Sequence, residues 1–331
     1  MNQPTFTPTP EQSDFVARLR EGRPVVCQAV AGSGKTTTLM LADRALGEMG
    51  KRGIYLAFNK AIVSEVTDEF HNCEVMTFHS LAYKIVNASP QYGPLLLKMN
   101  SDYTLRKPKD IANALGLKER FYYWPREFEE MEEAGITPPD KKRYYTSVRL
   151  VSEALHALSN WCDSAESEVS DEFVRIPDSI STRDHESFRE TVAAMAKRLW
   201  HEDILNPQGK IDFSHDYYLK LASLMRPLLV EVPGLNLRPG DVLMFDEAQD
   251  ARPSMTSIVY DQQLPYRYAY DYTQPGVFDP EQGGLVYQQL KDGQGNLVTP
   301  YLQAGEHMFK RELRNKFTWT IKLPLILHKN S

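Results

Sequence analysis

A stretch of small residues between a predicted strand and a predicted helix constrains the fold of this chain more than any other feature. Residues 24–31 are mainly apolar and predict a buried strand, and a helix is expected to begin at Lys35. At the junction, residues 29–36 have the order Ala-Val-Ala-Gly-Ser-Gly-Lys-Thr. Small residues let backbone N–H groups converge on a phosphate, and the helix N-terminus adds a favourable dipole. The order therefore predicts a phosphate-binding loop, in which alanine replaces the usual first glycine.

The loop pattern assigns roles to individual residues. Lys35 is expected to reach the β- and γ-phosphates of a nucleoside triphosphate, and Thr36 is expected to bind Mg²⁺. The alternative is a small-residue turn that matches by chance, but such a turn need not follow a strand and open a helix. The residues of this segment that we expect to bind ATP are Ala31, Gly32, Ser33, Gly34, Lys35, Thr36 and Thr37.

Two acidic residues follow another apolar run. Residues 241–245 predict a buried strand that leads into Asp246 and Glu247. The carboxyl ends of parallel strands lie at one edge of a sheet, so these carboxylates are expected beside the phosphate-binding loop. Asp246 would bind Mg²⁺ through water, and Glu247 would orient and deprotonate the attacking water. The alternative is an acidic helix N-terminus, where carboxylates are favoured in any protein.

Strands and helices alternate on both sides of a long helical segment. This alternation predicts an α/β fold with a parallel sheet that helices cover on both faces. Between residues 89 and 226 the pattern is instead mainly helical, as in residues 141–162 and 183–200. The expected strands are 24–31, 53–58, 74–77, 241–245 and 266–270, and the expected helices outside the middle segment are 35–50, 61–70, 78–86 and 253–261.

The composition excludes some classes of protein without choosing a function. The 331 residues carry a formal net charge of −6, and 42% of them are hydrophobic, as in a globular protein. The overall acidic charge gives no sign of nucleic-acid binding, although a local basic groove can lie on an acidic protein. No apolar run is long enough for a membrane span, no signal peptide is evident, and the three scattered cysteines fit a reducing compartment. We therefore expect no membrane partner and a cytoplasmic location.

The loop and the acidic segment together resemble a known family. Residues 32–36 (Gly-Ser-Gly-Lys-Thr) and 246–250 (Asp-Glu-Ala-Gln-Asp) are similar to motifs of the UvrD/Rep group of superfamily 1 DNA helicases. Residues 57–61 and 77–82 resemble two segments with which that family binds single-stranded DNA. Residues 213–220 are most similar to the F-box DNA helicase and phage branch.

The resemblance covers roughly residues 9–90 and 210–275, and it implies a P-loop NTPase of the RecA-like type. Its cofactors would be ATP and Mg²⁺, its partner single-stranded DNA, and its setting the cytoplasm of a bacterial or phage-infected cell. The implied domains are residues 1–88 as the first part of a RecA-like ATP-binding domain, 89–226 as a helical insertion, 227–278 as the remainder, and 279–331 as a divergent tail.

Further site residues follow only from the resemblance. Gln12 would hydrogen-bond adenine, although an isolated glutamine before a helix usually faces solvent. Phe58 and Phe78 would stack on bases, and the alternative for both is core packing. For His79 the alternative is a capping or core histidine. The residues that the resemblance implies in DNA binding are Phe58, Asn59, Lys60, Thr77, Phe78 and His79.

The family pattern weakens after the acidic segment. Gln274 matches a glutamine that senses the γ-phosphate, but Tyr270 replaces the family's glycine. The residues after Phe278 are too few for the second RecA-like domain, which supplies arginines to the transition state. We therefore expect an ATP-dependent helicase-type motor with weak or no unwinding alone, unless a partner chain or self-association completes the cleft. The alternative is a non-motor ATP- and DNA-binding protein, or an inactive helicase remnant that needs a partner.

Overall fold

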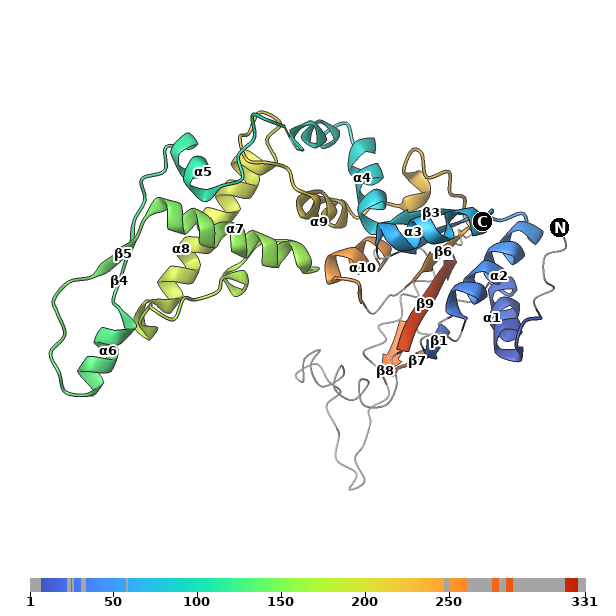
Figure 1. The fold of residues 1–331 in the computed structure, drawn as a ribbon, viewed down its shortest axis with the longest axis horizontal. Helices are drawn as coiled ribbons and strands as arrows, with labels where there is room; N and C mark the ends of the chain where they lie inside the picture. Colours follow the sequence, from blue (N-terminus) through green and yellow to red (C-terminus); the bar gives the residue numbers. More distant parts are fainter. Residues whose placement is uncertain are drawn as a thin grey trace, which may run out of the picture. The chain divides into compact units, whose positions relative to one another are not determined.

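The chain forms two compact units. A computed structural model describes residues 7–22, 25, 27–30, 34–57, 59–99, 101–246, 250–260, 276–279, 284–287 and 319–326 (Figure 1). Unit 1 comprises Met1–Leu81, Arg226–Ala251 and Ile258–Ser331, and unit 2 comprises Ala82–Met225 and Arg252–Ser257. In the described part of the chain, no helix is long and apolar enough to span a membrane.

Unit 1 is an α/β structure whose largest sheet has the strand order β1-β9-β6-β2-β3. Strands β2, β3 and β6 run parallel to one another, as the sequence pattern predicted. The N-terminal elements are α1 (Pro10–Arg20), β1 (Cys27–Val30), α2 (Lys35–Glu48), β2 (Gly53–Ala57), α3 (Lys60–Val66), β3 (Cys73–Thr77) and α4 (Phe78–Ala88), which continues into unit 2. The later ones are β6 (Val242–Phe245), α10 (Pro253–Tyr260), which unit 2 shares, β7 (Gly276–Asp279), β8 (Gly284–Tyr287) and β9 (Trp319–Ile326).

The sheet is mixed rather than wholly parallel, and this corrects the prediction. Strand β9 pairs antiparallel with both β1 and β6, so it lies between the strand that precedes Gly34 and the strand that ends beside Asp246. The prediction failed because it followed strand–helix alternation, which carries no information on a strand that returns from the C-terminal part of the chain. The strand expected at 266–270 lies outside the described residues.

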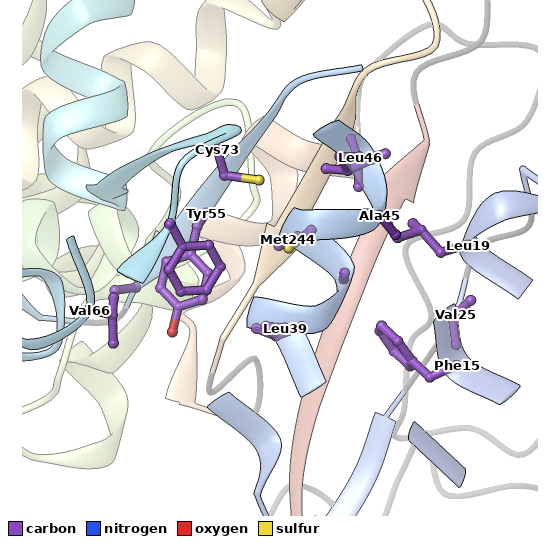
Figure 2. Close-up of a cluster of buried hydrophobic side chains, with 14 residues drawn as sticks. Phe15, Leu19, Val25, Leu39, Ala45, Leu46, Tyr55, Val66, Cys73 and Met244 are labelled. Atoms are coloured by element: carbon purple, nitrogen blue, oxygen red, sulfur yellow. The ribbon is translucent and has the colours of Figure 1, made fainter. Parts of the chain in front are cut away.

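Both faces of the central strands β2 and β6 are covered, because every residue of these two strands is buried. On one face Tyr55 and Met244 pack against Leu39 and Leu46 of α2, with Phe15 of α1 behind them (Figure 2). The buried apolar residues of both helices, Leu39 and Leu46 in α2 and Phe15 and Leu19 in α1, recur at helical spacing. The apolar pattern of the sequence therefore matches the core of the structure. The resulting cluster fixes the helix that begins at Lys35 against the sheet.

A buried carboxylate ties α2 to the start of β3. Asp43 is fully buried, and its two carboxylate oxygens accept hydrogen bonds from the backbone N–H groups of His71 and Asn72, both at 2.9 Å. These bonds satisfy backbone donors just before β3 begins at Cys73. They therefore help to fix the register of β3 beside the strands that form the candidate site.

Unit 2 is mainly helical, with one short antiparallel pair of strands. The sequence predicted a helix over 141–162, but residues 143–145 form β5 and pair with β4, and the helix begins only at Ser147. The elements are α5 (Pro108–Ala114), β4 (Phe121–Tyr123), α6 (Arg126–Glu133), β5 (Arg143–Tyr145), α7 (Ser147–Asp163), α8 (His185–Arg198), a π-helical turn (Leu199–Ile204) and α9 (His215–Met225). Short 3₁₀ turns of unit 2 lie at Gly93–Lys98, Asp171–Phe173 and Thr182–Asp184, and those of unit 1 lie at Thr67–Glu69 and Leu229–Glu231.

Two buried lysines complete helix ends in unit 2. The Lys220 ammonium donates to the carbonyl oxygens of Ser164 (2.9 Å) and Glu166 (2.6 Å), just past the end of α7. The Lys98 ammonium donates to the carbonyls of Asp203, Ile204 and Asn206 at 2.8, 3.1 and 3.0 Å, where the π-helical turn ends. Carbonyls at a helix C-terminus have no partner within the helix, so each cation supplies the missing donor.

Candidate nucleotide-binding site

The candidate site begins where α2 opens. Gly34 is the residue before the helix and has a φ of +83°, a left-handed conformation that favours glycine. Lys35 follows as the first helical residue and is 9% exposed, while Thr36 and Thr37 are half-buried in the same turn. The backbone N–H groups of this turn are those that a helix leaves without internal partners. The described end of the loop thus has the local geometry that anion binding requires.

Gln12 is buried against this helix start, which excludes the solvent-facing alternative. It is 7% exposed, its Nε2 donates to Thr38 Oγ1 at 3.2 Å, and the same nitrogen lies 3.5 Å from the Gly34 carbonyl oxygen. Its Oε1 accepts from the Thr9 backbone N–H at 3.0 Å, as part of a capping box that begins α1. Gln12 therefore connects the start of α1 to the start of α2.

Thr38 is a site residue that the sequence reasoning missed. Its hydroxyl donates to the Gly34 carbonyl at 3.0 Å, one helical turn back, and it receives the Gln12 amide. The spacing of four residues from Gly34 was visible in the sequence, but the partnership with Gln12 joins residues that are 26 positions apart. A pattern within one helix does not predict such a contact.

Asp246 lies at the carboxyl edge of the sheet, directly after β6. It is 3% exposed, and its backbone N–H donates to the Leu56 carbonyl at 2.9 Å, which extends the parallel pairing of β2 and β6 by one residue. Its Oδ2 accepts a hydrogen bond from the hydroxyl of Tyr55, a residue that the sequence reasoning did not assign to the site. Asp246 is thus held by both its backbone and its side chain.

The candidate DNA-binding residues follow β2 and β3 at the same edge. The Asn59 Oδ1 caps α3 by accepting from the Ile62 N–H at 3.0 Å, and both Asn59 and Lys60 are exposed. Thr77 is buried, and its Oγ1 accepts from the Ser80 N–H at 3.1 Å. His79 is half-buried, and it is not free of contacts with the rest of the protein. Among the described residues of this group, Asn59 and Lys60 are the two whose side chains are exposed.

Phe78 requires a correction. Its side chain is 1% exposed and packs edge to face against Phe245, with ring centroids 4.6 Å apart and an interplanar angle of 63°. A base cannot stack on a ring that is already enclosed, so the core-packing alternative describes this residue and we remove it from the DNA-binding set. The sequence could not distinguish the two because an aromatic residue at a strand end suits either role.

The predicted site residues that lie outside the described residues are Ala31, Gly32, Ser33, Phe58, Glu247 and Gln274.

The described oxygen donors suit Mg²⁺. This ion prefers oxygen ligands, and proteins commonly bind it through one or two carboxylates together with water and substrate phosphates. The Thr36 hydroxyl and the Asp246 carboxylate are such donors. Among the described residues no cluster of three or more His, Cys, Asp or Glu side chains could hold a metal alone. The chemistry of these two donors is therefore compatible with Mg²⁺.

One curated protein shares sequence similarity with most of the chain. Over 256 residues the chain is 26% identical to F-box DNA helicase protein 1 of Schizosaccharomyces pombe, and the aligned part is 77% of this chain and 26% of that protein. The chain thus spans about a quarter of the length of this relative. No family model matches the chain, and no solved structure matches it. The similarity supports a helicase-related origin, and the α/β sheet of unit 1 is compatible with it.

Proposed function

We propose that the chain is the ATP-binding core of a DNA helicase-type motor, built on a RecA-like P-loop NTPase fold of the UvrD/Rep kind. The observation that carries the proposal is that one unit holds both a left-handed Gly34 opening a helix at buried Lys35 and a buried Asp246 ending a parallel strand. Each feature is common alone, but together they are the two halves of a nucleoside triphosphatase site.

In this proposal the site residues have separate tasks. Lys35 would neutralise charge on the β- and γ-phosphates, and Gln12 would contact the adenine from its position against Gly34 and Thr38. Thr36 and Asp246 would hold Mg²⁺, which would polarise the phosphates and offset their charge. Glu247 would accept a proton from the attacking water, and Gln274 would sense the γ-phosphate.

The proposed partner is single-stranded DNA at the carboxyl edge of β2 and β3. Exposed Lys60 provides a cation for the phosphate backbone, and Asn59 provides an amide group beside it. Thr77 ends β3 and His79 follows it at the same edge, and Phe58 remains the candidate for base stacking. A motor of this kind couples the closing of its nucleotide site to movement along the strand.

A second candidate function is a non-motor switch that binds ATP and DNA, or that needs a partner chain for hydrolysis. The observation in its favour is that the described strand β9 pairs with both β1 and β6 and so belongs to the sheet of unit 1. An arginine that stabilises the transferred phosphate would then come from a partner or from self-association.

Steady-state ATP hydrolysis, with and without single-stranded DNA, tests the proposal. If self-association completes the cleft, we expect DNA-stimulated turnover, with Glu247→Gln lowering it about 10²- to 10⁴-fold while nucleotide still binds, because the general base is lost. Lys35→Ala should abolish nucleotide binding itself, and Lys118→Ala, an exposed lysine of unit 2, should change neither quantity.

Other outcomes separate the candidates. Nucleotide binding that depends on Lys35, with turnover appearing only when a partner chain is added, would favour the switch. A wild-type chain that does not bind ATP would contradict both functions.

A further inference from the structure

Tyr55 is a buried residue of the sheet whose hydroxyl reaches the candidate metal ligand. It lies in the middle of β2 and is fully buried, and its ring packs against Phe70 with centroids 4.6 Å apart. In the register of β2 and β6 it pairs with Met244, two residues before Asp246, so all three side chains are on one face of the sheet. The Tyr55 hydroxyl donates a hydrogen bond to Asp246 Oδ2.

The packing of Tyr55 does not by itself explain a tyrosine. Figure 2 shows its ring among the apolar side chains of the core, where a phenylalanine would bury the same surface. A buried phenol must find a hydrogen-bond partner, or its desolvation costs stability. Here that partner is the carboxylate at the carboxyl edge of the neighbouring strand. The hydroxyl therefore contributes to the orientation of Asp246 and not only to the core.

We infer that Tyr55 is a positioning residue for Mg²⁺-dependent nucleotide binding, because it fixes the orientation of the Asp246 carboxylate. This inference rests on the proposed function. A hydrogen bond to one carboxylate oxygen restricts rotation of the group, so the other oxygen keeps a single direction. Outer hydrogen bonds of this kind orient metal ligands, and their removal typically weakens metal binding about 10- to 100-fold. Phe70 supports the arrangement by holding the Tyr55 ring from the side.

The test removes one oxygen atom and measures metal dependence rather than turnover. Tyr55→Phe keeps the ring and its contact with Phe70, so the core should fold, which a thermal melt checks. The matched control is Tyr145→Phe, which deletes the hydroxyl of a tyrosine that is 1% exposed in unit 2 and lies 3.3 Å from Ser179 Oγ. The assay is binding of a fluorescent ATP analogue to the full chain at increasing Mg²⁺, repeated with Mn²⁺ and observed by electron paramagnetic resonance.

We expect Tyr55→Phe to raise the Mg²⁺ concentration for half-maximal nucleotide binding about tenfold or more. Nucleotide affinity in excess EDTA should stay unchanged, the sharp signal of free Mn²⁺ should be larger than in the wild type at the same total Mn²⁺, and Tyr145→Phe should match the wild type in every measurement. In an Asp246→Asn background, Tyr55→Phe should add nothing, because the two residues act through one contact.

Three results overturn the inference, and they are distinguishable. If the wild type binds nucleotide with Mg²⁺ and Tyr55→Phe has the same Mg²⁺ dependence, the inference alone fails. If the wild type binds no nucleotide at any Mg²⁺ concentration, the proposed function fails and the inference fails with it. An equal weakening in Tyr145→Phe would assign the effect to general loss of stability and would also contradict it.

Discussion

Lys220 and Lys98 place ammonium groups inside unit 2, where water cannot solvate them. Burial lowers the pKa of each to about 8, against a usual value of 10.5, although Glu166 and Cys162 oppose the shift at Lys220 and Asp203 and Asp212 oppose it at Lys98. The aromatic face of Trp161 lies 4.4 Å from the Lys220 nitrogen and supplies a further favourable contact for the cation. Each lysine is therefore a structural cation whose charge is maintained at neutral pH by carbonyl oxygens.

The lowered pKa of Lys220 predicts a pH-dependent stability difference. Below pH 8 both the folded and the unfolded states bind the proton. Between about pH 8 and 10.5 the folded state has released the proton while the unfolded state retains it. The free energy of unfolding of the wild type therefore increases as the pH rises through this range. Lys220→Met lacks this gain. We expect the variant to be less stable than the wild type by about 2–3 kcal/mol at pH 7, because two buried carbonyls lose their donor.

The measurement is urea unfolding of Lys220→Met and of the exposed control Lys118→Met at pH 7 and at pH 9.5. The stability gap between the wild type and Lys220→Met should widen at the higher pH, whereas the control should show no gap at either. A gap that narrows as the pH rises would show that the folded-state pKa lies above 10.5 instead.

Single residues also show how far the sequence could predict the candidate site. Gly34 and Lys35 were predicted because their geometry depends on a short local segment, a strand followed at once by a helix. The contact between Tyr55 and Asp246 was missed because it joins residues 191 positions apart, and only the pairing of β2 with β6 brings them together. Gln12 was assigned to the adenine, and its position against Gly34 and Thr38 appeared only in the structure.

At the scale of elements, helices with a wide apolar stripe and the strands of the parallel sheet were predicted, whereas the two three-residue strands of unit 2 were not. The helical part of residues 141–162 followed from the spacing of Leu150, Leu158 and Trp161, all buried in α7. Strands β4 and β5 are only three residues long each, which is too short for an alternating pattern to appear. Their pairing depends instead on aromatic contacts such as that of Tyr123 with Tyr145, whose ring centroids are 5.1 Å apart.

The backbone of Gly209 lies so close to the π-helical turn at the end of α8 that a larger residue would not fit there. A Cβ atom at Gly209 would lie 2.0 Å from the Asp203 carbonyl oxygen, and this backbone atom cannot move aside easily because Lys98 also binds it. We expect Gly209→Ala to reduce the free energy of unfolding by about 3 kcal/mol or more, through forced backbone displacement.

The matched control for this substitution is Gly116→Ala. Gly116 has a φ of +63°, but a Cβ there would meet no atom within 4 Å, so only backbone strain of about 1–2 kcal/mol is expected. Chemical denaturation of both variants makes the comparison. Equal losses in the two would show that the loop around Gly209 can relax.

At the scale of the whole molecule, the division into two compact units predicts that nucleotide changes the unfolding temperature of one unit and not of the other. Unit 1 holds the candidate site, whereas Trp161 and Trp200 are buried in unit 2 and contact each other with centroids 4.9 Å apart. A ligand that binds only one folded unit stabilises that unit, by about 2.7 kcal/mol at a concentration 100 times its Kd. We expect ATP with Mg²⁺ to raise the unfolding midpoint of unit 1 by several degrees and to leave that of unit 2 nearly unchanged.

Differential scanning calorimetry of the full chain provides the measurement, combined with tryptophan fluorescence of a Trp319→Phe variant, in which every remaining tryptophan belongs to unit 2. Lys35→Ala is the control, because it should remove the shift without changing either transition in the absence of nucleotide. One transition that moves as a whole on nucleotide addition would contradict independent unfolding of the units.

The position of β9 has a consequence for how the protein is made. Cys27 of β1 pairs with Lys322 of β9, and Val242 of β6 pairs with Ile326 on the other side of the same strand. Protein synthesis is vectorial, so β1 emerges from the ribosome long before its neighbour in the sheet exists. Until residues 319–326 follow, two strand edges of unit 1 remain open to other chains. Unpaired strand edges of this kind can pair with other chains, so the last strand of the sheet to be synthesised is also the one that closes both edges.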